Sequence, residues 1–562
     1  MDSFQFLNAS SKSTMQIFIV FLMFLTQTLW SNSILPCEAE TVRDEGGVYA
    51  EKRQGARPNF IILFVDDLGW GDLGANWNED GLPSDTPFLD ELAAKGTRFT
   101  DFHAGASLCT PSRAALLTGR LGKRTGVVGN FNVQSCAGMP LNETTMAETF
   151  NAAGYRTGMI GKWHLGIYGG FGPVHRGFDS YLGIPYSDDM GCVDNPGYNL
   201  PPCPPCNHST GYGTLYDLFL KILAKGTFPC NKMAAVPLIE NTTIIEQPVD
   251  LAAVAGHYKK HASSFIKQSA QDGKPFLLYV AFTHVHVPLL FNTKFAGTSA
   301  RGPFGDTVRE LDDTVAGIME AVRQAGVEND TMVWFTSDNG PWAAKCLYAG
   351  SSGPFLGLWQ KTKGGGGSTA KMTIWEAGHR EPTFAYWPGH IPAGRVSDSL
   401  LSALDIYPTI ASIAGIPMPK YRGYDGMDVK DVLFGGSIYE RTLFHPNSMA
   451  SGALGDIGAV RQGRYKAVYQ IGSARPNCLG ETSPPRHRNP PLIFDIYKDP
   501  AEGQPLDQSS AEYKSALQDI EASLQAFLED VKQDNTTVAD YRQDPRCIPC
   551  CNPNQVDCRC SG

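Results

Sequence analysis

Segment 108–120 contains a cysteine, a proline, a serine and an arginine in the order C-T-P-S-R. Thr110 is a suitable helix N-cap and Pro111 a suitable first helical residue, so we expect a helix to begin there. Cys109 would then lie just before the helix N-terminus, where free N–H groups and the helix dipole favour an anion. Arg113 adds a planar, permanently charged group that suits a tetrahedral oxyanion. The segment therefore predicts an anion site next to a cysteine.

Two pairs of oxygen-bearing residues, Asp66-Asp67 and Asp338-Asn339, each follow an apolar run. Hard divalent cations such as Ca²⁺ prefer carboxylate and amide oxygens, and the two pairs together can supply several. Either pair alone would be weak evidence, because Asp and Asn commonly cap strands and begin turns. Their shared position at the ends of two predicted strands instead predicts one oxygen-rich metal site.

Two further segments carry basic and histidine side chains. Lys162 and His164 lie in the glycine-flanked sequence G-K-W-H-L-G, and His284 and His286 lie two residues apart. A lysine can hold an anion and a histidine can transfer a proton near neutral pH. The alternative for the first segment is an exposed lysine and a packed histidine. Because alternate strand positions point to the same side, the second pair could bind zinc, although no third ligand is evident nearby.

The elements that must position these residues have the pattern of an α/β sheet. The apolar runs 59–65, 276–282 and 331–336 predict buried strands of a parallel sheet. Segment 86–96 predicts a helix with an N-cap, an early proline and a glycine stop, and apolar spacing predicts another over 308–322. Ligands of such sheets bind beyond the carboxyl ends of the strands, where the acidic and histidine residues lie here. This placement favours an enzyme.

The character of the chain changes near residue 441. Short strand-like segments at 459–461, 465–469 and 492–497 precede a helix with apolar residues on one side over 517–531. We therefore expect a catalytic domain over residues 57–440 and a smaller C-terminal domain over 441–562, with an antiparallel sheet, a helix and a Cys-rich tail. The four glycines from Gly364 to Gly367 predict a local flexible segment.

The N-terminal residues predict export. The apolar run 17–25 follows Lys12 and is too short for a stable membrane span, so we expect a signal peptide within residues 1–39, cleaved after Ser33 or Ala39. The compartment would be the secretory pathway, with the extracellular space favoured and the lysosomal lumen as the alternative. The chain has 562 residues and a formal net charge of −10, which argues against a general nucleic-acid binder.

Fourteen cysteines fit an oxidised, disulfide-bearing protein. A half-cystine is therefore the ordinary alternative for Cys109. The spacing of Cys203 and Cys206 also fits zinc, although an exported chain disfavours it. The five cysteines from Cys547 to Cys560 predict a disulfide-stapled tail. Acceptor sequons for N-linked glycans stand at Asn142, Asn207, Asn241, Asn329 and Asn535.

The C-T-P-S-R core and the tail ending in Thr-Gly-Arg resemble the motif of the type I, formylglycine-dependent sulfatases, and among them the arylsulfatases. Segments 161–166 and 284–288 resemble the G-K-W-H-x-G and H-T-H-x-P blocks of that family. Segment 371–382 resembles the K-G-T-x-x-E-G-G-x-R-E-P block, from which Met372 and Ala377 depart where glycines are usual. A further arylsulfatase segment matches residues 183–189.

The resemblance implies an alkaline-phosphatase-like fold, with a large mixed central sheet sandwiched by helices. It implies that a formylglycine-generating enzyme oxidises Cys109 during maturation, and that the hydrated aldehyde attacks the sulfur of a sulfate ester. One Ca²⁺ per chain would be bound by Asp66, Asp67, Asp338, Asn339 and an oxygen of the modified Cys109. The other site residues implied are Arg113, Lys162 and Lys371 as sulfate contacts, His164 as base, His286 as proton donor to the leaving group, and Ser187 as a second-tier contact.

Two other functions remain open from the sequence. One is a phosphonate or phosphodiester hydrolase of the same superfamily, and the other is a secreted matrix protein that binds sulfated polysaccharide. The sulfate-ester substrate would be a sulfated polysaccharide, another sulfated sugar, a lipid or a steroid. No nucleic-acid partner and no stable membrane span are expected, and a homo-oligomer is compatible with the sequence.

Overall fold

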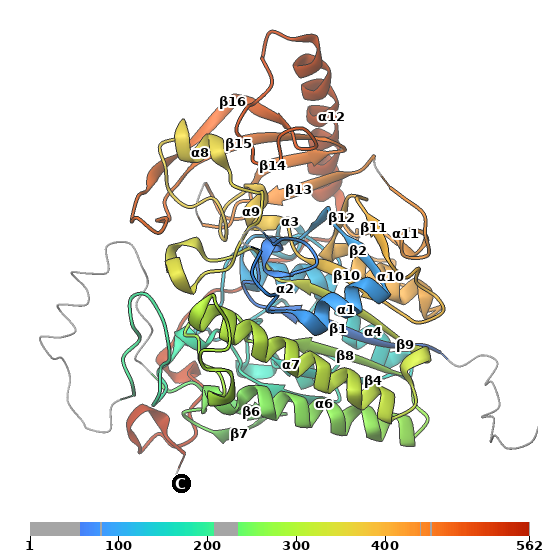
Figure 1. Ribbon diagram of the computed structural model, residues 1–562, viewed down its shortest axis with the longest axis vertical. Helices are drawn as coiled ribbons and strands as arrows, with labels where there is room; N and C mark the ends of the chain where they lie inside the picture. Colours follow the sequence, from blue (N-terminus) through green and yellow to red (C-terminus); the bar gives the residue numbers. More distant parts are fainter. Residues whose placement is uncertain (1–56, 79–80, 207–233, 439, 450–451, 561–562) are drawn as a thin grey trace, which may run out of the picture. The chain divides into compact units, whose positions relative to one another are not determined.

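The computed structural model describes residues 57–560 except 79–80, 207–233, 439 and 450–451 (Figure 1). The expected signal peptide, the sequon at Asn207 and Cys230 lie outside the described residues. Among the helices of the described part, none combines the length and apolar character needed to cross a membrane. The four described sequons lie at exposed positions, namely Asn142, Asn241, Asn329 and Asn535.

A mixed sheet of ten strands forms the centre of the described chain (Figure 1). Five neighbouring strands, β9, β1, β8, β4 and β5, run parallel, and β10 pairs antiparallel with both β9 and β2. In sheet order the strands are β11 (Arg395–Ser397), β2 (Thr97–Phe99), β10 (Thr383–Tyr386), β9 (Thr331–Ser337), β1 (Asn59–Val65), β8 (Phe276–Ala281), β4 (Arg156–Gly161), β5 (Ser180–Gly183), β6 (Leu238–Glu240) and β7 (Thr243–Glu246). The predicted parallel strands are confirmed.

Helices cover both faces of this sheet because the central strands are apolar on both sides. In β1, residues Ile61 and Leu63 pack in a core with α1 (Pro87–Lys95), α6 (Val254–Gln271) and α7 (Gly302–Gln324), and the last two helices lie side by side (Figure 1). Residues Phe60, Ile62 and Phe64 point the other way, because successive strand residues alternate between faces. They pack in a second core with α2 (Cys109–Thr118), α4 (Met146–Ala152) and α10 (Ile406–Ile413). The expected fold, a mixed sheet sandwiched by helices, is confirmed.

A second sheet is built from the C-terminal part of the chain. Its four antiparallel strands are β13 (Thr442–Pro446), β14 (Ile457–Gln462), β15 (Tyr465–Ser473) and β16 (Ser483–Asp495). Helix α12 (Ala511–Gln533) packs on one face through Tyr513 and Ile520, which lie in a core with Val460. The opposite face packs against Trp375. The expected smaller sheet with a helix is therefore present.

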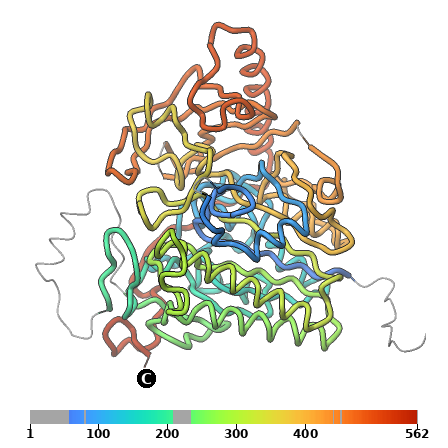
Figure 2. Tube along the Cα trace, in the orientation of Figure 1, coloured from blue at the N-terminus to red at the C-terminus, as the bar shows by residue number. Residues whose placement is uncertain are grey.

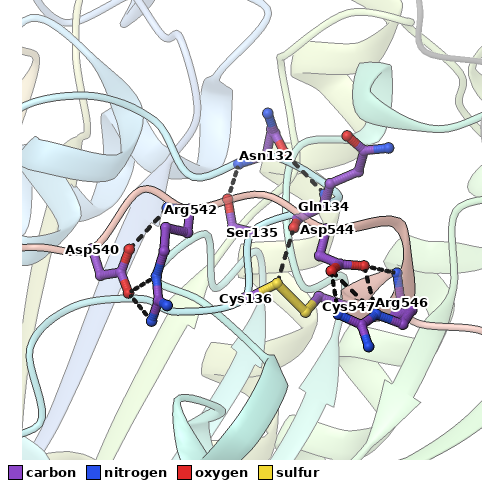
Figure 3. Close-up of a disulfide and its surroundings, with 9 residues drawn as sticks. All are labelled: Asn132, Gln134, Ser135, Cys136, Asp540, Arg542, Asp544, Arg546 and Cys547. Atoms are coloured by element: carbon purple, nitrogen blue, oxygen red, sulfur yellow. Dashed lines mark hydrogen bonds and ion pairs between the residues drawn. A yellow bond between two sulfur atoms is a disulfide. The ribbon is translucent and has the colours of Figure 1, made fainter.

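The segment after α12 leaves the small sheet and returns to the large one (Figure 2). The side chain of Gln247 donates to the carbonyl of Pro549 and accepts a hydrogen bond from the backbone of Cys551. A disulfide joins Cys136 to Cys547, and the two flanking segments exchange backbone hydrogen bonds (Figure 3). The tail therefore packs against the part of the chain that carries the large sheet.

The disulfides confirm that the C-terminal tail is cross-linked, and they exclude the zinc site considered at Cys203 and Cys206. Within the tail, Cys550 pairs with Cys558 and Cys551 with Cys560. The zinc interpretation of the Cys203–Cys206 spacing is wrong, because Cys206 pairs with Cys192 and Cys203 is also disulfide-bonded. A cysteine in a disulfide has no thiolate to offer a metal. A further disulfide joins Cys346 to Cys478.

The flexible segment expected from Gly364 to Gly367 is instead fixed by hydrogen bonds. The side chain of Gln360 donates to the carbonyls of Gly364 and Gly366, and the hydroxyl of Ser483 also donates to Gly366. The expectation was wrong because the glycine run alone shows neither the hydrogen bonds of the nearby Gln360 nor that of Ser483, which is distant in the sequence. Residues 365–367 all have positive φ, which explains the glycines there.

The remaining elements are short. They are β3 (Phe102–His103), β12 (Leu401–Ser402), α3 (Gly122–Thr125), α8 (Leu358–Thr362), α9 (Glu376–His379), α11 (Lys430–Leu433), and the 3₁₀ turns η1 (Trp70–Asp72), η2 (Tyr168–Gly170), η3 (Pro173–His175), η4 (Asp188–Met190), η5 (Leu251–Ala253), η6 (Thr293–Phe295), η7 (Glu328–Asp330), η8 (Ala343–Tyr348), η9 (Ala403–Asp405), η10 (Pro545–Cys547) and η11 (Val556–Cys558).

Candidate active site

The carboxyl ends of the parallel strands bring most of the predicted site residues together. Asp66 and Asp67 follow β1, and Asp338 and Asn339 follow β9, which is the neighbour of β1. The segments after β4, β5 and β8 add the residues Lys162, His164, Ser187 and His286. The sequence predicted this edge of the sheet as the site.

Helix α2 begins earlier than the sequence suggested. Cys109 is its first residue and the extended residue Leu108 is its N-cap, whereas Thr110 was expected as the cap. The reason is that the hydroxyl of Thr110 donates to the carbonyl of His164, 2.8 Å away, and makes no capping hydrogen bond. Cys109 therefore lies in the first turn, where unsatisfied N–H groups favour an anion as expected.

Cys109 is the only cysteine of the described residues that is not in a disulfide. Its side chain is buried, with 1% exposure, and its Sγ lies 3.8 Å from Oδ1 of Asp66. Burial raises the pKa of the Cys109 thiol to about 12, in spite of nearby lysines. Because the thiolate is the reactive form, an unmodified Cys109 would be a poor nucleophile near neutral pH.

The oxygen-bearing residues fit a divalent cation. One ligand atom each from Asp66, Asp67, Cys109 and His286 lies within 4.8 Å of the others. Asp338 is joined to this group, since its Oδ1 accepts a hydrogen bond from the backbone N–H of Asp67. The Oδ1 of Asn339 is buried and has no hydrogen-bond partner among the described residues. A buried acceptor without a donor is costly, and a cation would satisfy it.

Three cations balance the three carboxylates of the site. Nζ of Lys162 lies 2.6 Å from Asp66, and Nζ of Lys371 lies 2.5 Å from Asp67. The guanidinium of Arg113 lies 2.6 Å from Asp338 and 3.4 Å from Asp66. All six side chains are buried. An added divalent cation would therefore leave the site positive, which suits an anionic substrate.

The buried charges shift the pKa values of the carboxyl groups in opposite directions. Burial raises the pKa of Asp338 to about 7, and the negative charge of Asp66 adds to this rise. Burial also acts to raise the pKa of Asp66, but the positive charge of Lys162 and those of its neighbours outweigh burial and lower it. Such opposed shifts in one cluster are typical of functional sites.

The surroundings of the two histidines proposed for proton transfer favour their uncharged forms. Burial lowers the pKa of both His164 and His286 well below the usual value, and nearby lysines add to this. Nε2 of His164 lies 2.9 Å from the carbonyl of Phe131, so the proton is assigned to Nε2. Its buried Nδ1 has no hydrogen-bond partner among the described residues and is free to accept a proton.

His284 and His286 do not share a site. Strand β8 ends at Ala281, before both histidines, so the expected strand alternation is wrong. Nε2 of His284 lies 3.2 Å from Glu310, whereas the ring of His286 lies 3.3 Å from Oγ of Ser187 and 3.6 Å from Asp67. The zinc alternative for this histidine pair has no support in these contacts.

The loop that carries Lys371 contains the two departures from the family pattern. Met372 has a φ of 72°, a left-handed conformation that favours glycine. Its side chain is buried against Leu108, which precedes Cys109. Ala377 lies in α9 and is buried. The loop therefore adopts a conformation in which Lys371 reaches Asp67 without a glycine at position 372.

Sequence reasoning missed four buried or half-buried neighbours of the site. Asp188 lies 3.4 Å from Nδ1 of His286, Glu310 holds His284, and Trp342 packs 5.5 Å from the His286 ring. Lys345 lies over Trp342. Asp188 could have been suspected because it follows Ser187, but no local pattern marks the other three residues.

Comparison with known proteins gives consistent matches over nearly the whole described chain. A family model described as "Sulfatase" matches residues 58–416, and one described as "C-terminal region of aryl-sulfatase" matches residues 439–560. Arylsulfatase G of Canis lupus familiaris is 51% identical over 508 residues, which are 90% of this chain and 92% of the relative. Arylsulfatase A of Homo sapiens is 39% identical over 526 residues, which are 90% of this chain and 95% of the relative. From the motif blocks alone we expect the greatest similarity to arylsulfatase A, whereas the overall identity is higher to arylsulfatase G.

A solved structure agrees with this assignment of the fold. The structure of the PsFucS1 sulfatase from Pseudoalteromonas sp. superposes with a TM-score of 0.71 at 26% identity. The match covers 87% of this chain and 93% of the other.

Proposed function

We propose that this chain, which belongs to the sulfatase family, hydrolyses sulfate esters with a formylglycine formed from Cys109 and one Ca²⁺ bound beside it. The single observation that supports this most strongly is the state of Cys109. It is the one described cysteine outside a disulfide, and it begins a helix beside three carboxylates and three cations.

The residues around Cys109 fit both the formylglycine and the calcium ion. Asp66, Asp67, Asp338 and the unpaired Oδ1 of Asn339 would hold the calcium, with an oxygen of the modified Cys109. When present, the aldehyde hydrate supplies a hydroxyl nucleophile for sulfur, and calcium supplies positive charge against the sulfate oxygens.

The three cations of the site would bind and orient the sulfate group. Lys162, Lys371 and Arg113 are buried, and each lies against a carboxylate. Fixed positive charges in a site that excludes water stabilise the charge that develops on the sulfuryl oxygens. With the carboxylates engaged in holding a calcium ion, the lysines would be available to the sulfate.

The two histidines His164 and His286 would move protons at opposite ends of the reaction. His164 has a free Nδ1 that can accept a proton from the hydrate. His286 would donate a proton to the leaving oxygen, and a bound anionic substrate would favour its charged form. Ser187, which lies 3.0 Å from Nζ of Lys162 and 3.3 Å from His286, would orient both side chains.

The setting of the enzyme is proposed from the sequence. Residues 1–39 would be a signal peptide, residues 57–440 a catalytic domain and residues 441–562 a C-terminal domain, in line with the ranges of the two family matches. The protein would meet the formylglycine-generating enzyme in the secretory pathway and act outside the cell, with the lysosomal lumen as the alternative. The four exposed sequons would accept glycans, and a homo-oligomer is compatible with these features.

Sulfate release from 4-nitrophenyl sulfate tests the function. The protein made in a host that forms formylglycine should turn the substrate over, and Cys109→Ala should lower the rate by about a thousandfold or more, since the nucleophile is removed. A faster reaction with bis(4-nitrophenyl) phosphate would favour the phosphodiesterase alternative. Binding of heparin without release of sulfate from either class of ester would favour the matrix protein.

A further inference from the structure

Lys345 is a buried lysine at the edge of the site with no role in the reaction described above. It lies in η8 with 1% exposure, and its Nζ donates to the carbonyl of Leu200, 2.9 Å away. The same Nζ lies 4.3 Å from the centre of the Trp342 ring. An ammonium group has three N–H donors, so one carbonyl and one aromatic ring leave it incompletely satisfied.

The other buried lysines of the described chain all have a carboxylate partner. Lys162 pairs with Asp66, Lys371 with Asp67, and Lys466 with two glutamates. For Lys345, no carboxylate of the described residues lies at ion-pair distance. Burial lowers the pKa of Lys345 to about 8, and the charge of Lys371 adds to this. A buried cation without a counter-ion is costly unless an anion binds to it.

Lys345 shares an aromatic neighbour with Lys371, the proposed sulfate contact. Nζ of Lys371 lies 4.8 Å from the centre of the same Trp342 ring, so the two ammonium groups lie on one tryptophan. The ring of His286, proposed to protonate the leaving oxygen, lies 5.5 Å from that ring. The Trp342 ring therefore lies next to Lys371, His286 and Lys345.

We propose that Lys345 binds a second anionic group, a carboxylate or a further sulfate, on the leaving-group part of the substrate. This rests on the proposed sulfatase function and narrows its substrate to sulfate esters that carry another negative charge nearby. The ammonium would gain a charge-assisted hydrogen bond on binding, and the carbonyl of Leu200 and the Trp342 ring would hold it in place. Asp189, the largest acidic influence on Lys345, makes no ion pair with it in the described part of the chain.

Matched aryl sulfates test this assignment. Three aryl sulfates are compared, which differ in the second group on the ring: carboxyphenyl sulfate and sulfophenyl sulfate carry a second negative charge, and carbamoylphenyl sulfate, here called the neutral ester, carries an uncharged second group. Each is tested with that group in the ortho, meta and para positions. The quantity measured is the ratio of kcat/KM for each anionic ester to that for the neutral ester, in one enzyme preparation. This ratio does not depend on the fraction of active enzyme, so partial unfolding of a variant cannot change it.

We expect the wild-type ratio to reach about tenfold or more at one ring position at least, and to fall to about one in Lys345→Met. Lys345→Gln removes the charge but keeps a donor for Leu200, and should give the same result if Lys345→Met folds poorly. Lys345→Arg should retain part of the preference. Lys294→Met is the matched control, because Lys294 also lies over an aromatic ring, that of Phe295, but is exposed and paired with Asp313.

Two results would overturn the assignment. One is a wild-type ratio near one at every ring position, and the other is an undiminished ratio in both uncharged variants, as expected if Lys345 only supports the fold. A failure of the proposed sulfatase function would differ, since the wild type would then hydrolyse none of the esters, the neutral one included.

Discussion

Nζ of Lys371 lies 2.5 Å from Oδ1 of Asp67, so a loop residue distant in sequence completes the charge balance at the end of β1. The amide of Asn339 also donates to this carboxylate oxygen, 2.7 Å away. Asp67 itself has a φ of 61°, a left-handed conformation that aspartate tolerates better than most residues. The contact therefore joins β1, the end of β9 and the Lys371 loop at one carboxylate.

Replacement of Lys371 by methionine should impair turnover of sulfate esters. The change removes a fixed positive charge that is proposed to contact the sulfate, and we expect kcat/KM to fall by about a hundredfold or more. Steady-state kinetics with 4-nitrophenyl sulfate measures this. The exposed Lys363, which directly follows α8, provides the control Lys363→Met, which should keep wild-type kinetics. A Lys371→Met enzyme within about threefold of the wild type would exclude Lys371 from sulfate binding.

Substitution of Met372 by glycine should destabilise the protein although glycine suits the backbone there. Relief of the left-handed conformation would gain about 1 kcal/mol. Loss of the buried side chain beside Leu108 would cost about 2–5 kcal/mol, so the loss outweighs the gain. Thermal unfolding should show a lower Tm. An unchanged or higher Tm would mean that backbone strain at this position exceeds the packing contribution.

Calcium should stabilise the protein through Asn339. Dialysis against a chelator should lower both sulfatase activity and Tm, and added Ca²⁺ should restore both, because a ligand that binds only the native state raises its stability. In Asn339→Ala, the Ca²⁺ concentration needed for half of the Tm shift should rise by about tenfold or more, since a ligand oxygen is lost. An identical Ca²⁺ dependence in the variant would remove Asn339 from the metal site.

The pH dependence of stability should include a contribution from Glu502. Burial raises the pKa of this carboxyl to about 7, and the charge of Glu376 adds to the effect. Since the native state binds the proton more tightly than the unfolded state, the contribution is full below the ordinary glutamate pKa and is lost as pH rises toward 7. Glu502→Gln should therefore show a smaller fall of Tm between about pH 4.5 and 7 than the wild type.

A surface substitution separates this effect from general charge effects. Glu521 is exposed on α12, and Glu521→Gln should leave the slope of Tm against pH unchanged. Equal slopes in Glu502→Gln and the wild type would show that Glu502 does not titrate in this range in the folded protein.

The sequence predicted the parts of the site that follow buried strands. The apolar run of β1 and the residues after it showed where Asp66 would lie, because side chains at the ends of parallel strands meet at one edge of a sheet. The long-range contacts could not be predicted in the same way. Thr110 was expected to cap α2, but its hydroxyl bonds to the carbonyl of His164, which belongs to a different strand connection.

Residues without a local pattern were missed for the same reason. Lys345 lies in a short 3₁₀ turn, and its Nζ contacts the nearby Trp342 ring and the carbonyl of Leu200, which is far away in the sequence. The glycines from Gly364 to Gly367 suggested flexibility, whereas the carbonyls of Gly364 and Gly366 accept hydrogen bonds from Gln360, and that of Gly366 also accepts one from the distant Ser483. Local patterns therefore located strands and motifs, and tertiary contacts decided which polar side chains are held in the site.

Mass spectrometry of the tryptic peptide from Phe99 to Arg113 shows whether Cys109 has been converted to formylglycine. The protein should come from a secretory pathway that converts control sulfatases. We expect an aldehyde in place of the thiol at Cys109. An unmodified or disulfide-bonded Cys109 in such a host would contradict it, because a buried thiol with a pKa of about 12 is not a competent nucleophile near neutral pH.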